Sequence, residues 1–341
     1  MVESGTAYAW ARSITGLAIG LAVVGCNGAT VPTTVPGSAT TNEPVNPSAS
    51  KTPASEPTSS PVTARTSVPP RPTDLMAFAS KRNGTRQVYE MRADGSELVR
   101  VSHDQAGEQP SAWSSDRTRL LFSSDRGGHD EIYVMNADGT NPKRVAASTI
   151  PASGAHWSPD GTTIVFNADN SGTGCYQVFS MHADGSAVKQ LTTAGACNWS
   201  PVWSRSGDEI VFSTNSDGNF SIELMKPDGS GQRRLSTDMG RNDAFPVLSP
   251  DGTRLLFTSW DETLADTSAE VYVMNVDGSG RVQLTDNDVD DSYPTWSPDG
   301  QWVAFQSTRD GNPEIYAMLP DGSTVVRLTN DPGDDVAAVW Q

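Results

Sequence analysis

Cysteine and histidine are scarce in this 341-residue sequence, which contains three cysteines and four histidines. No CxxC pair occurs, which argues against a zinc ribbon and against a thioredoxin-type redox site. The histidines fall at unrelated spacings and form no metal-ligand pattern. GxSxG, HExxH and P-loop patterns are absent as well. The sequence therefore indicates no enzyme class that a single short motif identifies, although side chains distant in sequence can converge.

Basic residues are also few, because 24 Lys and Arg stand against 41 Asp and Glu, for a net charge of −17. The first 73 residues carry a net charge of +1, which leaves −18 on residues 74–341. A nucleic-acid-binding function is excluded, since it needs a basic face that releases counterions from phosphates. An acidic domain suits partners that are neutral, cationic or bridged by a metal ion.

No apolar run is long enough to span a bilayer. The run Ile14–Gly25 has twelve uncharged residues, which is the length of a signal-peptide core. It ends in Val23-Val24-Gly25-Cys26, which resembles a bacterial lipobox, and this resemblance implies a lipid on Cys26. We predict a signal peptide over residues 1–26 with lipidation of Cys26. A plain signal peptide, or a buried strand with an incidental cysteine, is the alternative.

Proline, threonine and serine dominate the next segment. Residues 31–73 contain ten Pro, nine Thr and seven Ser, but no Leu, Ile, Met or aromatic residue. Such a composition buries too little apolar surface to offset chain entropy. We predict a disordered, extended stalk over residues 27–73, which holds a folded domain away from a membrane; a generic linker is the alternative.

Residues 74–341 contain an internal repeat. The first landmark is an Asp-Gly turn, which recurs at successive gaps of 44, 46, 44, 49 and 44 residues. The second landmark is the residue before a Ser or near the chain end, a Trp in five of six repeats, and it recurs at gaps of 44, 46, 45, 48 and 44 residues. Two independent landmarks with one period establish the repeat. The turns begin at Asp94, Asp138, Asp184, Asp228, Asp277 and Asp321, and the second landmarks are Trp113, Trp157, Trp203, Leu248, Trp296 and Trp340.

Each repeat predicts four short strands separated by tight turns, which is typical of a β-propeller blade. Residues 75–102 supply three strands of a blade, whereas residues 336–341 supply one innermost strand. We therefore predict an all-β, six-bladed β-propeller over residues 74–341, closed by N- and C-terminal strands that share one blade. Closure of this kind removes exposed sheet edges.

The repeat resembles the propeller of the TolB family of bacterial periplasmic proteins. The resemblance rests on the turns Trp157–Gly161, Leu248–Gly252 and Trp296–Gly300, and on the strands Ile132–Gly139 and Val271–Gly278. It implies the fold and an extracytoplasmic location. TolB carries a folded domain before its propeller, and here a stalk takes that place. The resemblance therefore does not imply a role in the Tol–Pal system.

Polar residues recur five positions before the second landmark, where the chain enters each innermost strand. We expect them to ring one mouth of the central channel, where they would bind a cation or a basic partner. The alternative is that each side chain caps backbone N–H groups of its own loop. The candidate rim residues are Glu108, Asn198, Asp243, Asp291 and Asp335.

The densest acidic run is Asp286–Asp291, with Asp286, Asp288 and Asp290 as tentative Ca²⁺ ligands. The run lacks the Gly and the bidentate Glu of an EF-hand, so only an irregular Ca²⁺ site or a solvated acidic loop remains.

Cys175 and Cys197 fall on the same predicted face, around one blade. In an oxidising compartment this placement favours a disulfide, with two separate buried thiols as the alternative. Trp199, Phe220 and Trp260 lie in or near loops of that face, where aromatic side chains can stack on a sugar or anchor a protein.

These features predict a non-enzymatic binding or scaffold propeller at the bacterial cell envelope, whose partner is an envelope protein or glycan. We expect a monomer that meets the membrane only through its lipid anchor, in the periplasm or at the cell surface, or a secreted protein if Cys26 is not lipidated. The alternative is a carbohydrate-active lyase or hydrolase with its site in the channel mouth. A His, an Arg and a carboxylate gathered at channel depth would favour the enzyme.

Overall fold

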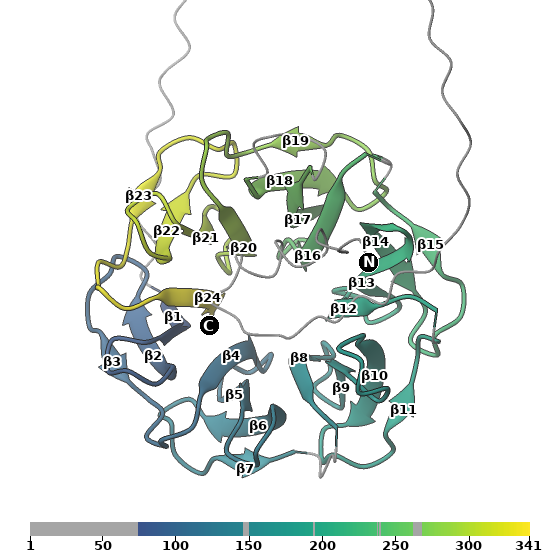
Figure 1. Ribbon diagram of the computed structural model, residues 1–341, viewed down its shortest axis with the longest axis horizontal. Helices are drawn as coiled ribbons and strands as arrows, with labels where there is room; N and C mark the ends of the chain where they lie inside the picture. The colour runs from purple at the N-terminus through teal and green to yellow at the C-terminus, as the bar shows by residue number, and fades with distance from the viewer. Residues whose placement is uncertain (1–73, 146–149, 194, 237, 239, 262–267) are drawn as a thin grey trace, which may run out of the picture. The chain divides into compact units, whose positions relative to one another are not determined.

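The computed structural model describes residues 74–145, 150–193, 195–236, 238, 240–261 and 268–341. These residues form six four-stranded antiparallel sheets arranged as blades around a central axis (Figure 1). The prediction of an all-β, six-bladed propeller is confirmed. The predicted signal peptide, the lipidation site Cys26 and the stalk lie outside the described residues. Within the described part, no helical segment has the length and apolar character needed to cross a bilayer.

The blades are numbered from the one that contains both the first and the last strand of the described region. Blade 1 consists of β24 (Asp335–Trp340), β1 (Leu75–Ser80), β2 (Gln87–Arg92) and β3 (Val99–Arg100). Blade 2 consists of β4 (Glu108–Trp113), β5 (Arg119–Ser124), β6 (Glu131–Asn136) and β7 (Lys143–Arg144). Blade 3 consists of β8 (Ala152–Trp157), β9 (Thr163–Ala168), β10 (Gln177–His182) and β11 (Lys189–Gln190).

The remaining blades follow the same order from the axis outward. Blade 4 consists of β12 (Asn198–Trp203), β13 (Ile210–Asp217), β14 (Asn219–Met225) and β15 (Arg233–Arg234). Blade 5 consists of β16 (Asn242–Leu248), β17 (Arg254–Trp260), β18 (Glu270–Asn275) and β19 (Val282–Gln283). Blade 6 consists of β20 (Asp291–Trp296), β21 (Val303–Ser307), β22 (Glu314–Met318) and β23 (Val326–Arg327).

The ring closes in blade 1, where β24 from the C-terminus pairs antiparallel with β1. Ser80 lies opposite Asp335 and Met76 lies opposite Trp340, with one irregularity between Ala77 and Ala79. β24 is the innermost strand of its sheet, as Figure 1 shows for every first strand of a blade. The apolar side chains of the two ends therefore join one hydrophobic cluster with the core of blade 6.

Apolar side chains fill the spaces between neighbouring blades. One cluster joins Ala77, Val88 and Val101 of blade 1 to Phe122 and Tyr133 of blade 2. The alternating pattern of each strand places one set of side chains against each neighbour, so both faces of a blade are buried. Most landmark aromatics of the repeat belong to these clusters, and Trp157 and Trp296 are each 4% exposed.

The innermost strands share a β-bulge that lies two residues after the rim position. The bulge is accompanied by positive φ angles at Gly154, Ser200, Phe245, Tyr293 and Ala337. Positive φ is uncommon for residues other than glycine, and bulges re-aim side chains and bend the strand. The aromatic rings of Phe245 and Tyr293 thereby meet, with centroids 4.2 Å apart, although they belong to neighbouring blades.

The antiparallel connections divide the molecule into two faces. The turn face carries the Ser-Pro-Asp-Gly turns, in which Asp251 accepts hydrogen bonds from the Ser249 hydroxyl at 2.5 Å and from the Thr253 backbone at 3.0 Å. These hydrogen bonds lower the pKa of Asp251 to about 2. The loop face, where the innermost strands begin, carries the irregular loops and the candidate site.

Removal of residues 335–341 tests whether the ring depends on β24. Without this strand β1 becomes a free edge and one hydrophobic cluster loses its inner wall, so we expect the cooperative unfolding transition to disappear. Thermal unfolding followed by circular dichroism and by calorimetry measures this. Trp296→Ala leaves a cavity in blade 6 without opening the ring. It should lower the free energy of unfolding by about 3–5 kcal/mol and keep one cooperative transition. A cooperative transition in the truncated chain would contradict the prediction.

Candidate functional site

The five predicted rim residues occupy equivalent places on the loop face. Four of them are the first residue of their innermost strand, and Asp243 is the second residue of β16. Their side chains are buried, with exposed fractions between 0% and 4% for Glu108, Asn198, Asp243, Asp291 and Asp335. The repeat therefore brings these residues to one level of the ring, beneath the loops.

An arginine of the same blade neutralises each of the four carboxylates. Arg309 lies 2.7 Å from Asp291, Arg82 lies 2.8 Å from Asp335, and Arg126 pairs with Glu108. Each arginine also stacks on aromatic rings of its blade; the guanidinium carbon of Arg309 is 4.7 Å from the Tyr316 ring centre. A stacked guanidinium holds a carboxylate in a fixed geometry, so these groups fix the positions of the loops.

Blade 5 reaches the same pairing by a different route. In blades 1, 2 and 6 the arginine follows a serine of the second strand by two positions. In blade 5 this position is occupied by Asp261. Arg281, which precedes the outermost strand, fills the vacant place and contacts Asp243 at 2.6 and 3.0 Å. It stacks on Tyr272 at 4.5 Å, as its counterparts do in their own blades. Sequence reasoning missed these arginines, although three of them recur at one phase of the repeat.

A second polar layer lies beside the first, on the strands β2, β6, β10, β14, β18 and β22. In blade 6, Glu314 accepts hydrogen bonds from the Thr329 hydroxyl at 2.5 Å and from the Asp331 backbone at 2.7 Å. Between blades 3 and 4, Asn198 at the start of β12 donates to Gln177 of β10 at 3.0 Å. This layer anchors the loops that connect one blade to the next.

The acidic loop before β20 is tied to its surroundings by hydrogen bonds. Asp290 accepts one from the Ala269 backbone at 3.0 Å, and Asn287 donates to Asp291 at 2.8 Å. No group of three or more His, Cys, Asp or Glu side chains in the described part of the chain is arranged to hold a metal ion. The tentative ligands Asp286, Asp288 and Asp290 thus do not form such a group.

A disulfide joins Cys175 to Cys197, with Cα atoms 4.8 Å apart. It links the loop before β10 to the loop that enters β12, so it ties blade 3 to blade 4. Tyr176 follows Cys175 directly, and Trp199 lies two residues after Cys197. The disulfide therefore fixes two aromatic residues of the loop face.

An aromatic cluster extends from this disulfide across blades 3, 4 and 5. The ring of Trp199 stacks on Phe220 with centroids 4.9 Å apart, and Tyr176 meets the edge of Trp199 at 6.4 Å. Phe220 in turn contacts Trp260 at 6.1 Å. Tyr176 and Trp260 are buried, whereas Trp199 and Phe220 remain partly exposed. The three aromatic residues singled out in the sequence thus come together on one side of the mouth.

Charged groups gather on the opposite side, where blades 6, 1 and 2 meet. Burial lowers the pKa of Arg86, which Asp130 and Asp334 oppose electrostatically. Burial likewise raises the pKa of Asp130, and Arg86 and His129 act against that shift. Arg86, Asp130 and His129, which come from loops of two blades, therefore lie near enough to influence the charge state of Asp130.

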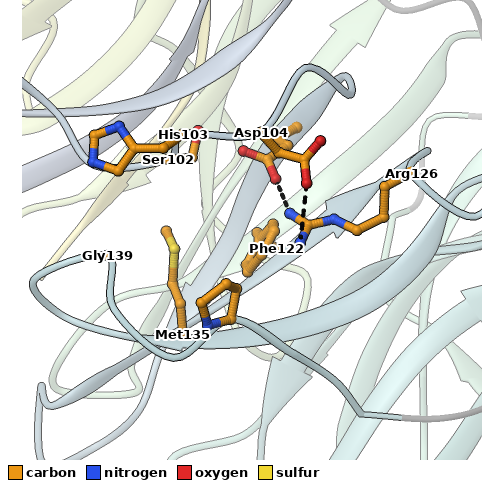
Figure 2. A pocket seen from close by; sticks show the side chains of 9 residues that line it. Ser102, His103, Asp104, Phe122, Arg126, Met135 and Gly139 are labelled. Carbon is orange, nitrogen blue, oxygen red and sulfur yellow. Dashed lines mark hydrogen bonds and ion pairs between the residues drawn. The ribbon is translucent and has the colours of Figure 1, made fainter.

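A pocket of about 290 Å³ lies between blades 1 and 2 (Figure 2). Figure 2 shows the Arg126 side chain entering from one side beside Asp104, with His103 on the far side and Met135 below. Burial raises the pKa of Glu108 in this pocket, whereas Arg126 lowers it. The lining residues are Ser102, His103, Asp104, Glu108, Phe122, Arg126, Met135, Gly139 and Pro142.

Residues 107–267 and 261–341 match the TolB β-propeller domain family. The chain belongs to this family. The predicted resemblance to the TolB propeller is thereby confirmed at the level of the family. Membership establishes the repeat and the architecture, whereas one fold of this kind supports many activities.

Curated relatives match over short segments. The dipeptidyl-peptidase 5 of Porphyromonas gingivalis is 37% identical over 68 residues, which are 19% of this chain and 10% of that protein. The Tol-Pal system protein TolB of Geobacter sulfurreducens is 38% identical over 81 residues, 24% of this chain and 17% of that protein. The chain thus spans less than a fifth of the length of either relative.

Solved structures support the same fold. TolB from Acinetobacter baumannii has a TM-score of 0.67 and 20% identity, covering 81% of this chain and 68% of that one. An oligogalacturonate lyase from Vibrio parahaemolyticus has a TM-score of 0.52 and 12% identity, covering 74% of each chain. At these identities the likeness concerns the fold alone.

Reduction of the disulfide should destabilise the propeller. Opening a cross-link between residues 22 positions apart costs about 3 kcal/mol in the chain-entropy estimate. We expect Cys175→Ser/Cys197→Ser and the reduced wild type to melt at similar, lowered temperatures. Cys26→Ser should leave the transition unchanged, because Cys26 takes no part in this cross-link. Equal melting temperatures with and without reductant would contradict the prediction.

Glu270 should make stability depend on pH. Burial raises its pKa to about 7, although hydrogen bonds from Thr285 and Asn287 oppose the shift. The folded state therefore holds this proton more tightly than the unfolded state does, and stability falls as the pH rises from about 4.5 to 7. Glu270→Gln should remove this slope and raise stability near pH 8 by roughly 1–3 kcal/mol.

Thermal melts between about pH 5 and 8 measure the effect. Glu314→Gln is the matched control at the equivalent position of blade 6, where Arg327 pairs with the carboxylate at 3.0 Å. This control should lower stability at every pH in that window. A parallel loss in both variants would disprove the assignment to Glu270.

Proposed function

We propose that this chain is a non-enzymatic binding propeller displayed at the bacterial cell envelope, and that it holds a protein partner on its loop face. The observation that carries this proposal is the aromatic cluster of Tyr176, Trp199, Phe220 and Trp260. Trp199 and Phe220 are partly exposed, while the buried rings of Tyr176 and Trp260 contact them.

Large aromatic side chains are the residues that most often dominate the energy of protein interfaces. A ring that is already fixed loses little conformational freedom on binding, which favours affinity. Here the disulfide Cys175–Cys197 fixes the chain beside Tyr176 and Trp199. The cluster therefore has the chemistry and the rigidity of a binding surface.

Charge supports a cationic or neutral partner. The propeller region carries −18, and the arginines of the loop face pair with its buried carboxylates. Such a field accelerates association with a basic protein surface and weakens it with an acidic one. A basic protein of the envelope is thus the partner that we favour over a glycan.

An extracytoplasmic location is part of the proposal. Disulfides persist in oxidising compartments, and a curated relative is a Tol-Pal system protein. A lipid on Cys26 and a Pro/Thr/Ser-rich stalk over residues 27–73 would display the propeller, as a monomer, in the periplasm or at the cell surface.

Site-specific photo-crosslinking tests the binding surface. A photoreactive amino acid at position 220 of the full chain should give a discrete protein adduct in a bacterial envelope fraction, and Trp199→Ala should abolish it. Val282→Ala, at an exposed apolar residue on the outer strand β19, is the matched control and should leave the adduct intact. An adduct that survives Trp199→Ala, or no adduct at all, would refute the surface. Trp199-dependent sedimentation with peptidoglycan would assign a glycan instead.

The charged side of the mouth favours a second candidate, a carbohydrate-active lyase or hydrolase. Arg86, Asp130 and His129 lie close enough to affect one another electrostatically, and Tyr293 lies near Arg86. An arginine beside a protonatable carboxylate is suited to hold an acidic sugar and to transfer a proton. Turnover of an anionic polysaccharide that is lost in Arg86→Ala and in Asp130→Asn would establish this candidate.

A further inference from the structure

The pocket between blades 1 and 2 contains a buried carboxylate oxygen that lacks a hydrogen-bond partner. Glu108 is 1% exposed, and Arg126 contacts its Oε1 atom only. Its Oε2 atom has no hydrogen-bond partner among the residues that the structure describes. A buried carboxylate oxygen without a donor costs free energy, so the pocket favours a ligand that brings one.

The neighbouring polar groups also offer acceptors. The Ser102 hydroxyl accepts a hydrogen bond from the Val88 backbone at 2.9 Å and donates to Gln87 at 3.2 Å. A hydroxyl oxygen has two acceptor sites, so Ser102 can accept a second bond. Asp104 lies 3.5 Å from Arg126, so the carboxylates of Asp104 and Glu108 share one guanidinium, while Arg100 donates to Gln87 and to the Ser102 and Asp104 carbonyl oxygens. The polar end of the pocket therefore offers a carboxylate oxygen and a hydroxyl oxygen to a cationic donor.

The geometry distinguishes an ammonium from a guanidinium group. A guanidinium binds carboxylates best when both oxygens accept its parallel N–H groups. Arg126 already occupies Oε1 of Glu108, which leaves one oxygen. An ammonium is a compact charge with three donors, and it matches a single carboxylate oxygen with a hydroxyl beside it.

The remaining walls are apolar and suit an alkyl stem. Phe122, Met135 and Pro142 line the pocket, and Phe122 is fully buried. A volume of about 290 Å³ lies at the lower limit of small-molecule sites. The space therefore suits one long side chain of a larger partner, whose methylene groups contact the apolar wall while the charged end reaches Glu108.

We propose that this pocket binds the ammonium group of a lysine side chain on a protein partner. The proposal rests on the binding function proposed above and names the chemistry of the partner. The pocket lies between blades 1 and 2, away from the aromatic cluster of blades 3 to 5, so the two proposals can fail separately.

Titration of the full chain with Nα-acetyl-lysine amide tests the pocket, with NMR of the probe as the readout. We expect saturable binding. Nα-acetyl-norleucine amide, which lacks the charge, and Nα-acetyl-arginine amide should each bind about tenfold more weakly or worse. Equal binding of the lysine and norleucine probes, equal binding of the arginine probe, or no saturable binding of the lysine probe would overturn the proposal.

Variants locate the binding. Glu108→Gln should weaken the lysine probe about tenfold or more, because it removes the charge that the ammonium meets. Asp291→Asn is the matched control, since Asp291 is the equivalent buried carboxylate of blade 6, pairs with Arg309 and also has one oxygen without a hydrogen-bond partner among the described residues. It should leave the affinity unchanged. An equal loss in both variants would overturn the assignment to this pocket.

His103→Trp provides a second variant that keeps the Glu108–Arg126 pair. His103 is exposed and lines the pocket, so a larger ring there should block entry without disturbing the core. Unchanged probe binding in this variant would count against the site. Probe binding without any crosslink at position 220 would refute only the aromatic surface, whereas a crosslink without probe binding would refute only the lysine pocket.

Discussion

Pairing of β24 with β1 is the interaction on which the rest of the propeller depends. Because the two ends of the folded region share one sheet, each blade packs between two neighbours and the hydrophobic clusters continue around the ring. Closure also completes the polar layer, since Asp335 at the start of β24 pairs with Arg82 that follows β1. The C-terminal strand is thus held both by backbone pairing and by a buried ion pair.

The loop face is built on carboxylates that are buried and paired. A buried ion pair gains little stability over apolar packing, but an unpaired buried charge is costly, so each pair constrains the position of its loop. Stacking of the arginines on aromatic rings constrains them further. Beside this framework, the described residues form the aromatic cluster, the charged loops of blades 1 and 2 and the pocket beside Glu108, on which the proposals rest.

Much of this arrangement follows from the phase of the repeat. Counting from the landmark residues places Glu108, Asn198 and Asp291 at one level of the ring, and the structure has them there. Counting does not reveal that Arg281 pairs with Asp243 in place of an arginine at position 261. Arg281 and Asp243 are 38 positions apart in the sequence and are close only in space. The convergence of Arg86 with Asp130 was missed for the same reason.

The sequence by itself determined the number of blades, the shared blade that closes the ring and the level at which polar residues recur. These depend on strand alternation and on turn residues, which are local and repeat with a fixed period. Only the tertiary structure decided which carboxylates are neutralised, which aromatic rings meet and where a pocket remains. Those features arise between neighbouring blades, where the length and direction of single side chains differ from one repeat to the next.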